Sequence, residues 1–308
     1  MNIASIDIGT NTVLLLIAEV DKQRNIFKPL LNKFNIPRIG KGLAVSGVIS
    51  RDKIDLLTTI LKDYKDEADK YNCEEIIAGC TYPFRAASNS VDIIKTIQDE
   101  TGINITTLKG EEEALFSFLG VTSDYKTDNN ITVIDIGGGS TELIVGSKNN
   151  ISYRKSAPFG VVNSTERLIK NYPVTAAELA RIRSEIRQNI SEEWSLIPRD
   201  YESVIAIAGT PTTLACIKSG LLNFDEELIH NSILEVCELE NYIEVLAKMT
   251  PREILDTYGN VLKNREDVIL MGTIILAEIC LFLRMDKIQV SSRGLRYGMI
   301  YKKYFQDF

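Results

Sequence analysis

The sequence predicts an α/β protein of two related domains around a central cleft, and three observations support this. The chain has 308 residues, 44% of them hydrophobic, which is more than one typical core accommodates. Segments typical of strands alternate with segments typical of helices. Two distant stretches repeat one pattern of apolar residues, aspartate, glycine and hydroxyl. We expect one domain over residues 1–124 and a second over residues 125–308, with the last helix free to pack back on the first.

The repeat relates "IDIGTNTVLLLIA", which begins at Ile6, to "IDIGGGSTELIVG", which begins at Ile134. In both copies a β-prone run precedes the aspartate and another follows the turn, which predicts strand, turn and strand. The run after Ser140 is too short for a helix, and the chain lacks G-x-x-x-x-G-K-[ST] and G-x-G-x-x-G, so P-loop and Rossmann sites are disfavoured. The aligned residues are Asp7 with Asp135, Gly9 with Gly137, and Thr12 with Ser140.

The remaining elements follow from apolar spacing. A third apolar run, "VIAIAGTPTTLACI", places Gly209 and Thr210 after a strand-like segment, and the polar residues 123–130 predict a linker. The apolar run from Val268 to Leu283 contains Glu278 and is short for a membrane span, so we interpret it as a buried helix. Further strands are expected over residues 75–83, 103–110 and 286–292, and helices over residues 50–71, 85–100, 111–121, 176–193, 212–219, 266–285 and 294–305.

The glycine turn indicates an anion site. Consecutive glycines at 137–139 let backbone amides approach a ligand, and successive amides form an anion-binding nest. Ser140 and Thr141 add hydroxyl donors. An aspartate beside a phosphate needs a cation between them, and Mg²⁺ prefers carboxylate, water and phosphate oxygens. Asp7 and Asp135 facing one cleft therefore predict Mg²⁺–phosphate chemistry. The alternative is a plain tight hairpin, and the repeated motif favours phosphate binding over it.

Two further stretches carry candidate side chains. In "LKGEEEALFSFLGV" three glutamates, Glu111 to Glu113, open a predicted helix, where acids complement the helix dipole whether or not they have another role. In "CTYPFRAASN" Arg85 lies at a strand-to-helix junction, where an arginine can bind phosphate oxygens or simply be solvated. Lys33, Arg38, Lys41, Arg293 and Arg296 are cations that could lead a polyanion to the cleft, and we interpret most of them as ordinary surface residues.

Composition excludes several classes of function. The formal net charge of −7 disfavours general nucleic-acid binding. Five scattered cysteines predict reduced thiols in a cytoplasmic protein, and neither a signal peptide nor a membrane anchor is expected. The single histidine, His230, excludes serine–histidine hydrolases and histidine-rich metal sites. We expect His230 to be a surface or helix-end residue.

Taken together in this order, the motifs resemble those of the exopolyphosphatase / guanosine pentaphosphate phosphatase family over essentially the whole chain. They are "IDIGTNTVLLLI", "CTYPFRAASN", "LKGEEEALFSFLGV", "VIDIGGGSTELIVG", "AIAGTPTTLACI" and "SSRGLRYGMI". The resemblance implies two ribonuclease-H-like domains of the actin-like, sugar-kinase-like superfamily. It also implies Mg²⁺-dependent hydrolysis of a terminal phosphoanhydride in polyphosphate or a phosphorylated guanine nucleotide, and a homodimer. The chain resembles the short, two-domain members.

The resemblance also assigns roles to residues of this chain. Glu113 is the expected general base, Arg85 is expected to offset charge on the phosphoryl oxygens, and Glu142 is expected to assist catalysis or metal binding. The expected metal ligands are Asp7, Asp135 and Glu142. The expected phosphate-binding residues are Thr10, Asn11, Thr12, Gly137, Gly138, Gly139, Ser140, Thr141, Gly209, Thr210 and Arg296.

Three positions depart from the family pattern and bear on substrate choice. Leu14 stands where an arginine is usual, Ala86 where an acid commonly follows the arginine, and Tyr297 where the late motif usually has glutamate. Two other classes of function stay open on the residues. One is an ATP-dependent small-molecule kinase of the same fold, and the other is a non-catalytic, nucleotide-controlled binding protein. The three-glutamate turn favours hydrolysis, because a binding cleft for polyanions has little use for an acid.

Overall fold

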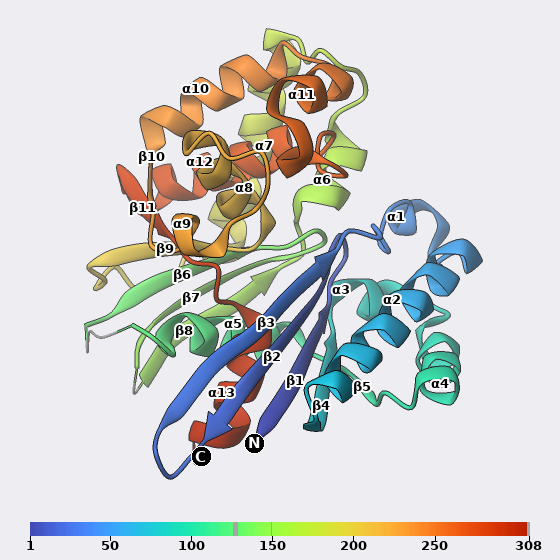
Figure 1. The fold of residues 1–308 in the computed structure, drawn as a ribbon. Helices are drawn as coiled ribbons and strands as arrows, with labels where there is room; N and C mark the ends of the chain where they lie inside the picture. The colour runs from blue at the N-terminus through green and yellow to red at the C-terminus, as the bar shows by residue number, and fades with distance from the viewer. Residues whose placement is uncertain (126–128, 149, 307–308) are drawn as a thin grey trace. The chain divides into compact units, whose positions relative to one another are not determined.

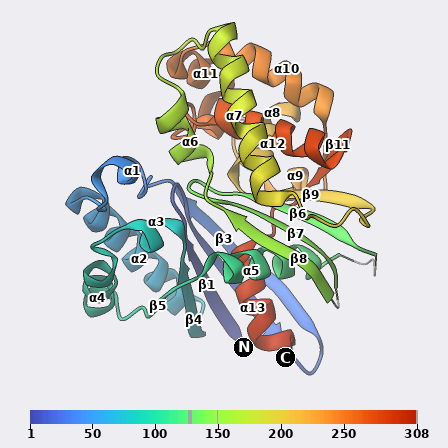
Figure 2. The same ribbon diagram turned by 180° about the vertical axis from the view of Figure 1, so that it is seen from behind.

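The computed structural model describes residues 1–125, 129–148 and 150–306, in two compact units (Figures 1 and 2). Unit 1 consists of Met1–Tyr125 and Arg293–Phe308, and unit 2 of Lys126–Ser292. The last helix therefore belongs to unit 1. Part of the predicted linker, residues 126–128, lies outside the described residues.

Unit 1 is built on a five-stranded mixed sheet. Its strand order is β3-β2-β1-β4-β5. β1, β2 and β3 are antiparallel neighbours, whereas β4 is parallel to β1 and β5 is parallel to β4. The hairpin of β1 and β2 confirms the strand–turn–strand prediction for the first repeat. The strands are β1 (Asn2–Ile8), β2 (Val13–Asp21), β3 (Ile26–Asn35), β4 (Cys73–Cys80) and β5 (Ile105–Thr107).

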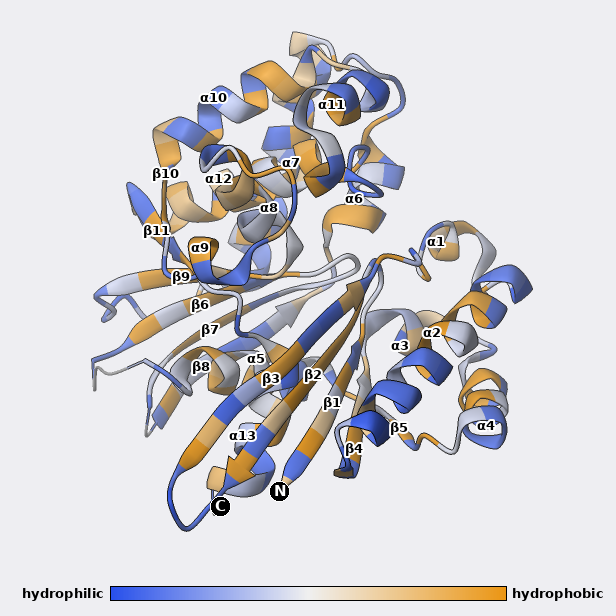
Figure 3. Cartoon of the chain, in the orientation of Figure 1, coloured by the Kyte–Doolittle hydropathy of each residue, from blue (hydrophilic) through white to orange (hydrophobic). Residues whose placement is uncertain are grey.

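Helices cover both faces of this sheet (Figures 1 and 2). α2 has one apolar and one polar face (Figure 3), and its predicted apolar residues Ile54, Leu57, Leu61, Tyr64 and Ala68 are all buried. On the opposite face α13 packs through Tyr297 and Ile300. The helices are α1 (Leu43–Ser46), α2 (Arg51–Lys70), α3 (Tyr82–Ala86), α4 (Ser90–Thr101), α5 (Gly110–Thr122) and α13 (Leu295–Phe305).

The single helix predicted over residues 85–100 is wrong at its start. Two helices, α3 and α4, occupy this stretch, and the chain is extended at Ala87 between them. The side chain of Asn89 explains the break, because its amide donates to the carbonyl of Ile49 at 2.9 Å and its oxygen accepts from the Ile49 N–H at 3.1 Å. An asparagine used in this way cannot also continue a helix smoothly.

Unit 2 contains a six-stranded mixed sheet. Its strand order is β10-β11-β9-β6-β7-β8, with β6, β7 and β8 antiparallel and with β9 parallel to β6. β11 is parallel to β9, and β10 adds an antiparallel edge. The strands are β6 (Ile131–Ile136), β7 (Thr141–Ser147), β8 (Asn150–Ala157), β9 (Ser203–Ile207), β10 (Ile233–Glu235) and β11 (Lys287–Val290).

The core of unit 2 is dominated by α12, which is buried along nearly its whole length. This confirms that the most apolar stretch is an interior helix. In the part of the chain that the structure describes, no helix is both long and apolar enough to cross a membrane. The helices are α6 (Val161–Leu168), α7 (Ala176–Trp194), α8 (Gly209–Lys218), α9 (Glu226–Ile229), α10 (Val236–Ala247), α11 (Pro251–Tyr258), the 3₁₀ turn η1 (Gly259–Leu262) and α12 (Ile269–Leu283).

The two sheets repeat one topology. Strands β3-β2-β1-β4-β5 of unit 1 correspond in order and direction to β8-β7-β6-β9-β11 of unit 2. The predicted fold class, two related α/β units of ribonuclease-H-like type, is therefore confirmed. The helix of the third motif begins at Gly209 rather than at the predicted Thr212, so its glycine and first threonine lie in the first turn of α8.

Candidate active site

The two aligned turns have the same backbone geometry. In unit 1 the N–H of Gly9 donates to the carbonyl of Thr12 at 3.0 Å, and in unit 2 the N–H of Gly137 donates to the carbonyl of Ser140 at 2.9 Å. A Cβ added to Gly137 would lie 2.9 Å from that same carbonyl oxygen, closer than side chains come, and a Cβ added to Gly9 would lie 3.0 Å from the corresponding one, a very tight contact. Glycine is therefore required by the turn itself, independently of any ligand.

The turn of unit 2 has its carbonyls occupied by the start of α6. Val161 donates its N–H to Gly137 at 3.0 Å, Val162 donates to Gly138 at 2.7 Å, and Asn163 donates its side-chain amide to Gly139 at 2.7 Å. Among the described residues, the N–H groups of Gly138 and Gly139 donate to no backbone carbonyl. The turn therefore has carbonyls that are held and amides that are available, the arrangement an anion requires.

Gly160 makes this arrangement possible. A Cβ at Gly160 would lie 2.6 Å from the Gly138 carbonyl carbon and 2.6 Å from the Gly139 nitrogen, so α6 reaches the turn only because this residue has no side chain. Phe159, immediately before it, accepts a hydrogen bond from the Thr141 hydroxyl at 2.6 Å and packs against Trp194 with ring centroids 5.4 Å apart. Ser140 and Thr141 are buried beside the turn.

Two carboxylates lie side by side in unit 2. Asp135 on β6 is the direct partner of Glu142 on β7, so both side chains are on one face of the sheet. Glu142 is fully buried, and the hydroxyl of Ser156, its partner on β8, donates to its Oε1 at 2.6 Å. In unit 1 the corresponding row runs from Asp7 to Leu14 and Phe34. The aspartate is repeated, but its acidic neighbour is not.

The third motif forms the N-terminus of α8, and the residue before this helix has an unusual backbone conformation. Ala208, the N-cap of α8, has φ 75° and ψ −165°, a conformation that is essentially confined to glycine. Thr210 is buried in the first turn and packs against Gly272 of α12. The positive end of the helix dipole and the first amides of α8 make this terminus a site for an anion.

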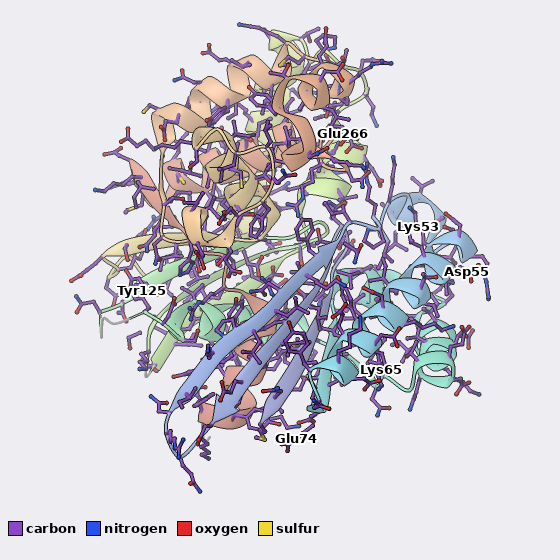
Figure 4. The ribbon with its side chains drawn as sticks, in the orientation of Figure 1. Lys53, Asp55, Lys65, Glu74, Tyr125 and Glu266 are labelled. Atoms are coloured by element: carbon purple, nitrogen blue, oxygen red, sulfur yellow. The ribbon has the colours of Figure 1, made fainter. Side chains whose placement is uncertain are left out.

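Arg265 adds a partly buried cation to this terminus, and sequence reasoning missed it. A Cβ on Gly209 would lie 1.8 Å from Arg265 Nη1, so the guanidinium lies directly over that glycine. Its Nη1 contacts Thr213 Oγ1 at 3.4 Å, and its backbone N–H donates to the side chain of Glu266 at 3.0 Å. Glu266 is labelled in Figure 4. Burial lowers the pKa of Arg265 to about 10. The available signal was an arginine directly before an apolar helix, where burial of a cation demands a partner.

The three glutamates of α5 have different environments. Glu111 and Glu112 are exposed, and Glu112 caps the helix by accepting the N–H of Lys109 at 2.8 Å. Glu113 is 7% exposed, and its Oε2 lies 2.7 Å from Nη1 of Arg85. That same Nη1 donates to the carbonyl of Leu108 at 2.8 Å. The structure thus brings together the two side chains that the resemblance names as base and phosphate-binding arginine.

The other predicted residues lie as follows. Thr10 and Asn11 are buried in the first turn. Arg296 on α13 is 8% exposed, donates its Nε to Asn32 of β3 at 3.2 Å and lies over the ring of Tyr297. His230 is the C-cap of α9, which confirms a helix-end position, and its Nδ1 accepts the N–H of Ser292 at 3.2 Å. Among the described residues, no group of three or more acidic, histidine or cysteine side chains forms a metal cluster.

Comparison with known proteins identifies the family of this chain. The profile of the Ppx/GppA phosphatase family matches residues 16–306. The chain belongs to this family. The resemblance seen in the sequence is thereby confirmed, and membership supports a phosphatase that releases phosphate by hydrolysis.

Individual relatives of this Ppx/GppA chain agree. It is 34% identical over 307 residues to the bifunctional 3-dehydroquinate synthase/phosphatase of Fusobacterium nucleatum, covering 96% of this chain and 46% of that protein. The chain thus spans about half the length of that relative. It is 27% identical over 310 residues to exopolyphosphatase 2 of Mycobacterium tuberculosis, covering 96% and 97% of the two chains. The crystal structure of the Aquifex aeolicus family member matches with a TM-score of 0.84 at 27% identity, covering 98% and 97%.

Proposed function

We propose that this chain is a Mg²⁺-dependent phosphatase that releases orthophosphate from the end of inorganic polyphosphate or guanosine pentaphosphate. The observation that carries the proposal is the turn at residues 137–139, whose carbonyls are held by α6 while its amides stay available, beside the Asp135–Glu142 pair. Similarity to exopolyphosphatase 2 of Mycobacterium tuberculosis supports polyphosphate as the substrate.

The acid pair fits a magnesium ion. Mg²⁺ is usually bound through one or two carboxylates together with waters and substrate phosphates, and it needs no cluster of three acidic side chains. Asp135 and Glu142 would hold it, with Ser156 fixing the Glu142 carboxylate. Asp7 of unit 1 remains a predicted metal ligand. When bound, the ion would offset the negative charge of the phosphate chain.

The candidate phosphate-binding groups lie at the two turns and at the start of α8. The amides of Gly138 and Gly139, together with Ser140, would bind oxygens of the terminal phosphates. Thr141 remains a predicted phosphate ligand, although its hydroxyl donates to the carbonyl of Phe159. The first turn would contribute Thr10, Asn11 and Thr12 in the same way. The start of α8 would bind a further phosphate through Gly209, Thr210 and the guanidinium of Arg265. Arg296 remains a predicted phosphate ligand, although its Nε is bonded to Asn32.

The chemical step we propose uses Glu113 as general base. Glu113 accepts a proton from a water molecule, whose oxygen attacks the terminal phosphorus. The bond from that phosphorus to the bridging oxygen breaks, and the shortened chain leaves with its oxyanion. Arg85, which contacts Glu113 at 2.7 Å, orients the Glu113 carboxylate and can offset charge on the transferred group. General-base catalysis contributes about 10²- to 10⁴-fold in rate.

The test is orthophosphate release by the full chain from a panel of substrates with and without Mg²⁺. The panel contains polyphosphates of several lengths, guanosine pentaphosphate, ATP and a simple phosphomonoester. The phosphomonoester is included because the name of the Fusobacterium nucleatum relative specifies a phosphatase without its substrate. We expect Mg²⁺-dependent release from a phosphoanhydride without any acceptor. Release only with an added alcohol or carboxylate acceptor would instead identify a kinase, and no turnover would identify a binding protein.

A further inference from the structure

The basic residues considered as a path for a polyanion have different environments. Lys33 contacts Asp63 at 2.9 Å and Glu67 at 3.2 Å, and Arg293 contacts Asp124 at 3.1 Å. Arg296 is buried against Asn32. These three are held by side chains of unit 1. Arg38 differs from them because its backbone N–H bonds to the first turn, residues 9–12.

The segment around Arg38 is bonded directly to that turn. The N–H of Arg38 donates to the carbonyl of Asn11 at 3.1 Å, and the N–H of Gly40 donates to the carbonyl of Thr10 at 2.9 Å. On the other side, Lys53 of α2 (Figure 4) donates its Nζ to the carbonyl of Pro37 at 2.9 Å. Residues 37–40 therefore hold the carbonyls of the first turn, as the start of α6 does for the second.

Arg38 occupies this place at an energetic cost. Its φ is 55°, in the left-handed region, which is unfavourable for a residue with a side chain. In the described part of the chain, four of the seven non-glycine residues with positive φ are asparagines, which tolerate this region, and Arg284 is the C-cap of α12. The remaining two, Arg38 and Ala208, each adjoin a candidate phosphate site. Strain of this kind gathers at functional sites.

The first turn also needs a cation that its own residues do not supply. Residues 9–12 are glycine, threonine, asparagine and threonine, and Asp7 precedes them. The partner of Asp7 on β2 is Leu14, an apolar residue. A terminal phosphate held by this turn would meet a carboxylate and no positive charge from the hairpin, which opposes binding.

We propose that Arg38 binds phosphoryl oxygens of the substrate at the first turn and supplies the cation that position 14 lacks. This inference rests on the proposed function and names a residue of the same site. An arginine is suited to the role, because its planar guanidinium donates two parallel hydrogen bonds to a phosphate. The hydrogen bond from the Arg38 N–H to the carbonyl of Asn11 keeps this residue beside the turn.

The variant Arg38→Gly separates binding from folding. Glycine adopts φ 55° without strain and keeps the N–H that holds Asn11, so the variant is expected to be at least as stable as the parent. Arg38→Lys keeps the charge but loses the two-pronged geometry. Arg284→Gly is the matched control, since Arg284 has a similar φ of 60° and is exposed at the end of α12.

Calorimetric binding of tripolyphosphate gives the readout, in the Glu113→Gln background so that hydrolysis does not interfere. We expect Arg38→Gly to weaken binding about 10- to 100-fold, the effect of losing hydrogen bonds from a charged group. The affinity of Arg38→Lys should lie between those of Arg38→Gly and the parent, and the affinity of Arg284→Gly should match that of the parent. In the active enzyme the loss should appear mainly in KM.

Equal affinities of the Arg38→Gly and parent chains would overturn the assignment, as would no measurable tripolyphosphate binding by the parent. The outcome does not depend on hydrolysis. A parent that binds tripolyphosphate through Arg38 but releases no phosphate would contradict the proposed function and leave this inference standing.

Discussion

Asp135 on β6 lies directly opposite Glu142 on β7, whereas Asp7, its counterpart in unit 1, lies opposite Leu14. The repeat therefore preserves the turn and the first acid, but only unit 2 has two neighbouring carboxylates. We therefore expect the two hairpins to have different roles in binding. Under the proposed function, we expect unit 2 to hold the divalent ion and unit 1 to depend on a cation from outside its hairpin.

The first prediction follows from this asymmetry. Glu142→Gln should raise the Mg²⁺ concentration needed for half-maximal activity at least about 10-fold, because an amide is a weaker ligand than a carboxylate. Asp7→Asn should have a smaller effect, since Asp7 has no acidic neighbour in its row. Magnesium titrations of phosphate release and calorimetric Mg²⁺ binding measure both. An equal or larger effect for Asp7→Asn would show that the metal is held mainly by unit 1.

A second prediction concerns Glu113. Glu113→Gln should lower kcat by about 10²- to 10⁴-fold and leave tripolyphosphate affinity nearly unchanged, because the amide cannot accept the proton. Glu111→Gln is the control, as Glu111 is exposed two residues earlier on the same helix. Near-normal turnover in Glu113→Gln would remove Glu113 from the role of base. An inactive Glu111→Gln would show that the whole helix start is sensitive to charge.

Ala208 gives a prediction about stability. Ala208→Gly should raise the free energy of unfolding by about 1 kcal/mol, because strain of about 1–3 kcal/mol is relieved while glycine gains some entropy in the unfolded chain. Denaturant unfolding measures the change. Ala180→Gly, at an exposed position within α7, should instead lower stability by about 1 kcal/mol. Loss of stability in Ala208→Gly would mean that this backbone carries no strain.

Glu75 gives a prediction about pH. Lys303 and Tyr304 of α13 bond to Glu75 on β4, and the hydrogen bond from Lys303 is the main cause that lowers the pKa of Glu75 below its usual 4.5. A carboxylate with a lowered folded-state pKa stabilises the protein above pH 4.5, and this contribution is lost as pH falls through the folded pKa.

At neutral pH, Glu75→Gln should therefore cost less than about 1 kcal/mol, because the ion pair is partly exposed. The difference from the parent should shrink as the pH falls below 4.5. Thermal unfolding measured across this range tests it, with the exposed neighbour Glu74→Gln as control. A difference that grows on acidification would contradict the assigned ion pair.

The sequence revealed the fold because its signals are local. Period-two and helical spacing predicted the hairpins, α2 and the buried α12, and the aligned aspartates predicted the repeated topology. Contacts between residues far apart in the sequence could not be predicted from these local signals. The break at Asn89 depends on Ile49, the position of Arg265 depends on Gly209, and the strain at Arg38 depends on Asn11. Each of these contacts joins residues far apart in the sequence and leaves no periodic pattern of apolar residues.

The candidate site was predicted by residue type but not by arrangement. The glycines and hydroxyls of the second turn were identified, yet the reason that its amides are available is Gly160, which brings α6 to the carbonyls. Likewise, acids at the start of α5 are equally expected for helix stability. Burial and the contact with Arg85 distinguish Glu113 from its two neighbours.

Amide resonances of the glycines test the central claim most directly. The chain has 19 glycines, few enough to resolve after selective ¹⁵N-glycine labelling. Tripolyphosphate and Mg²⁺ are added to the Glu113→Gln chain until binding saturates. We predict the largest shifts at Gly138 and Gly139, and none at Gly102 and Gly220, which have open space around them. Saturated binding with unchanged Gly138 and Gly139 resonances would show that the phosphates are held elsewhere.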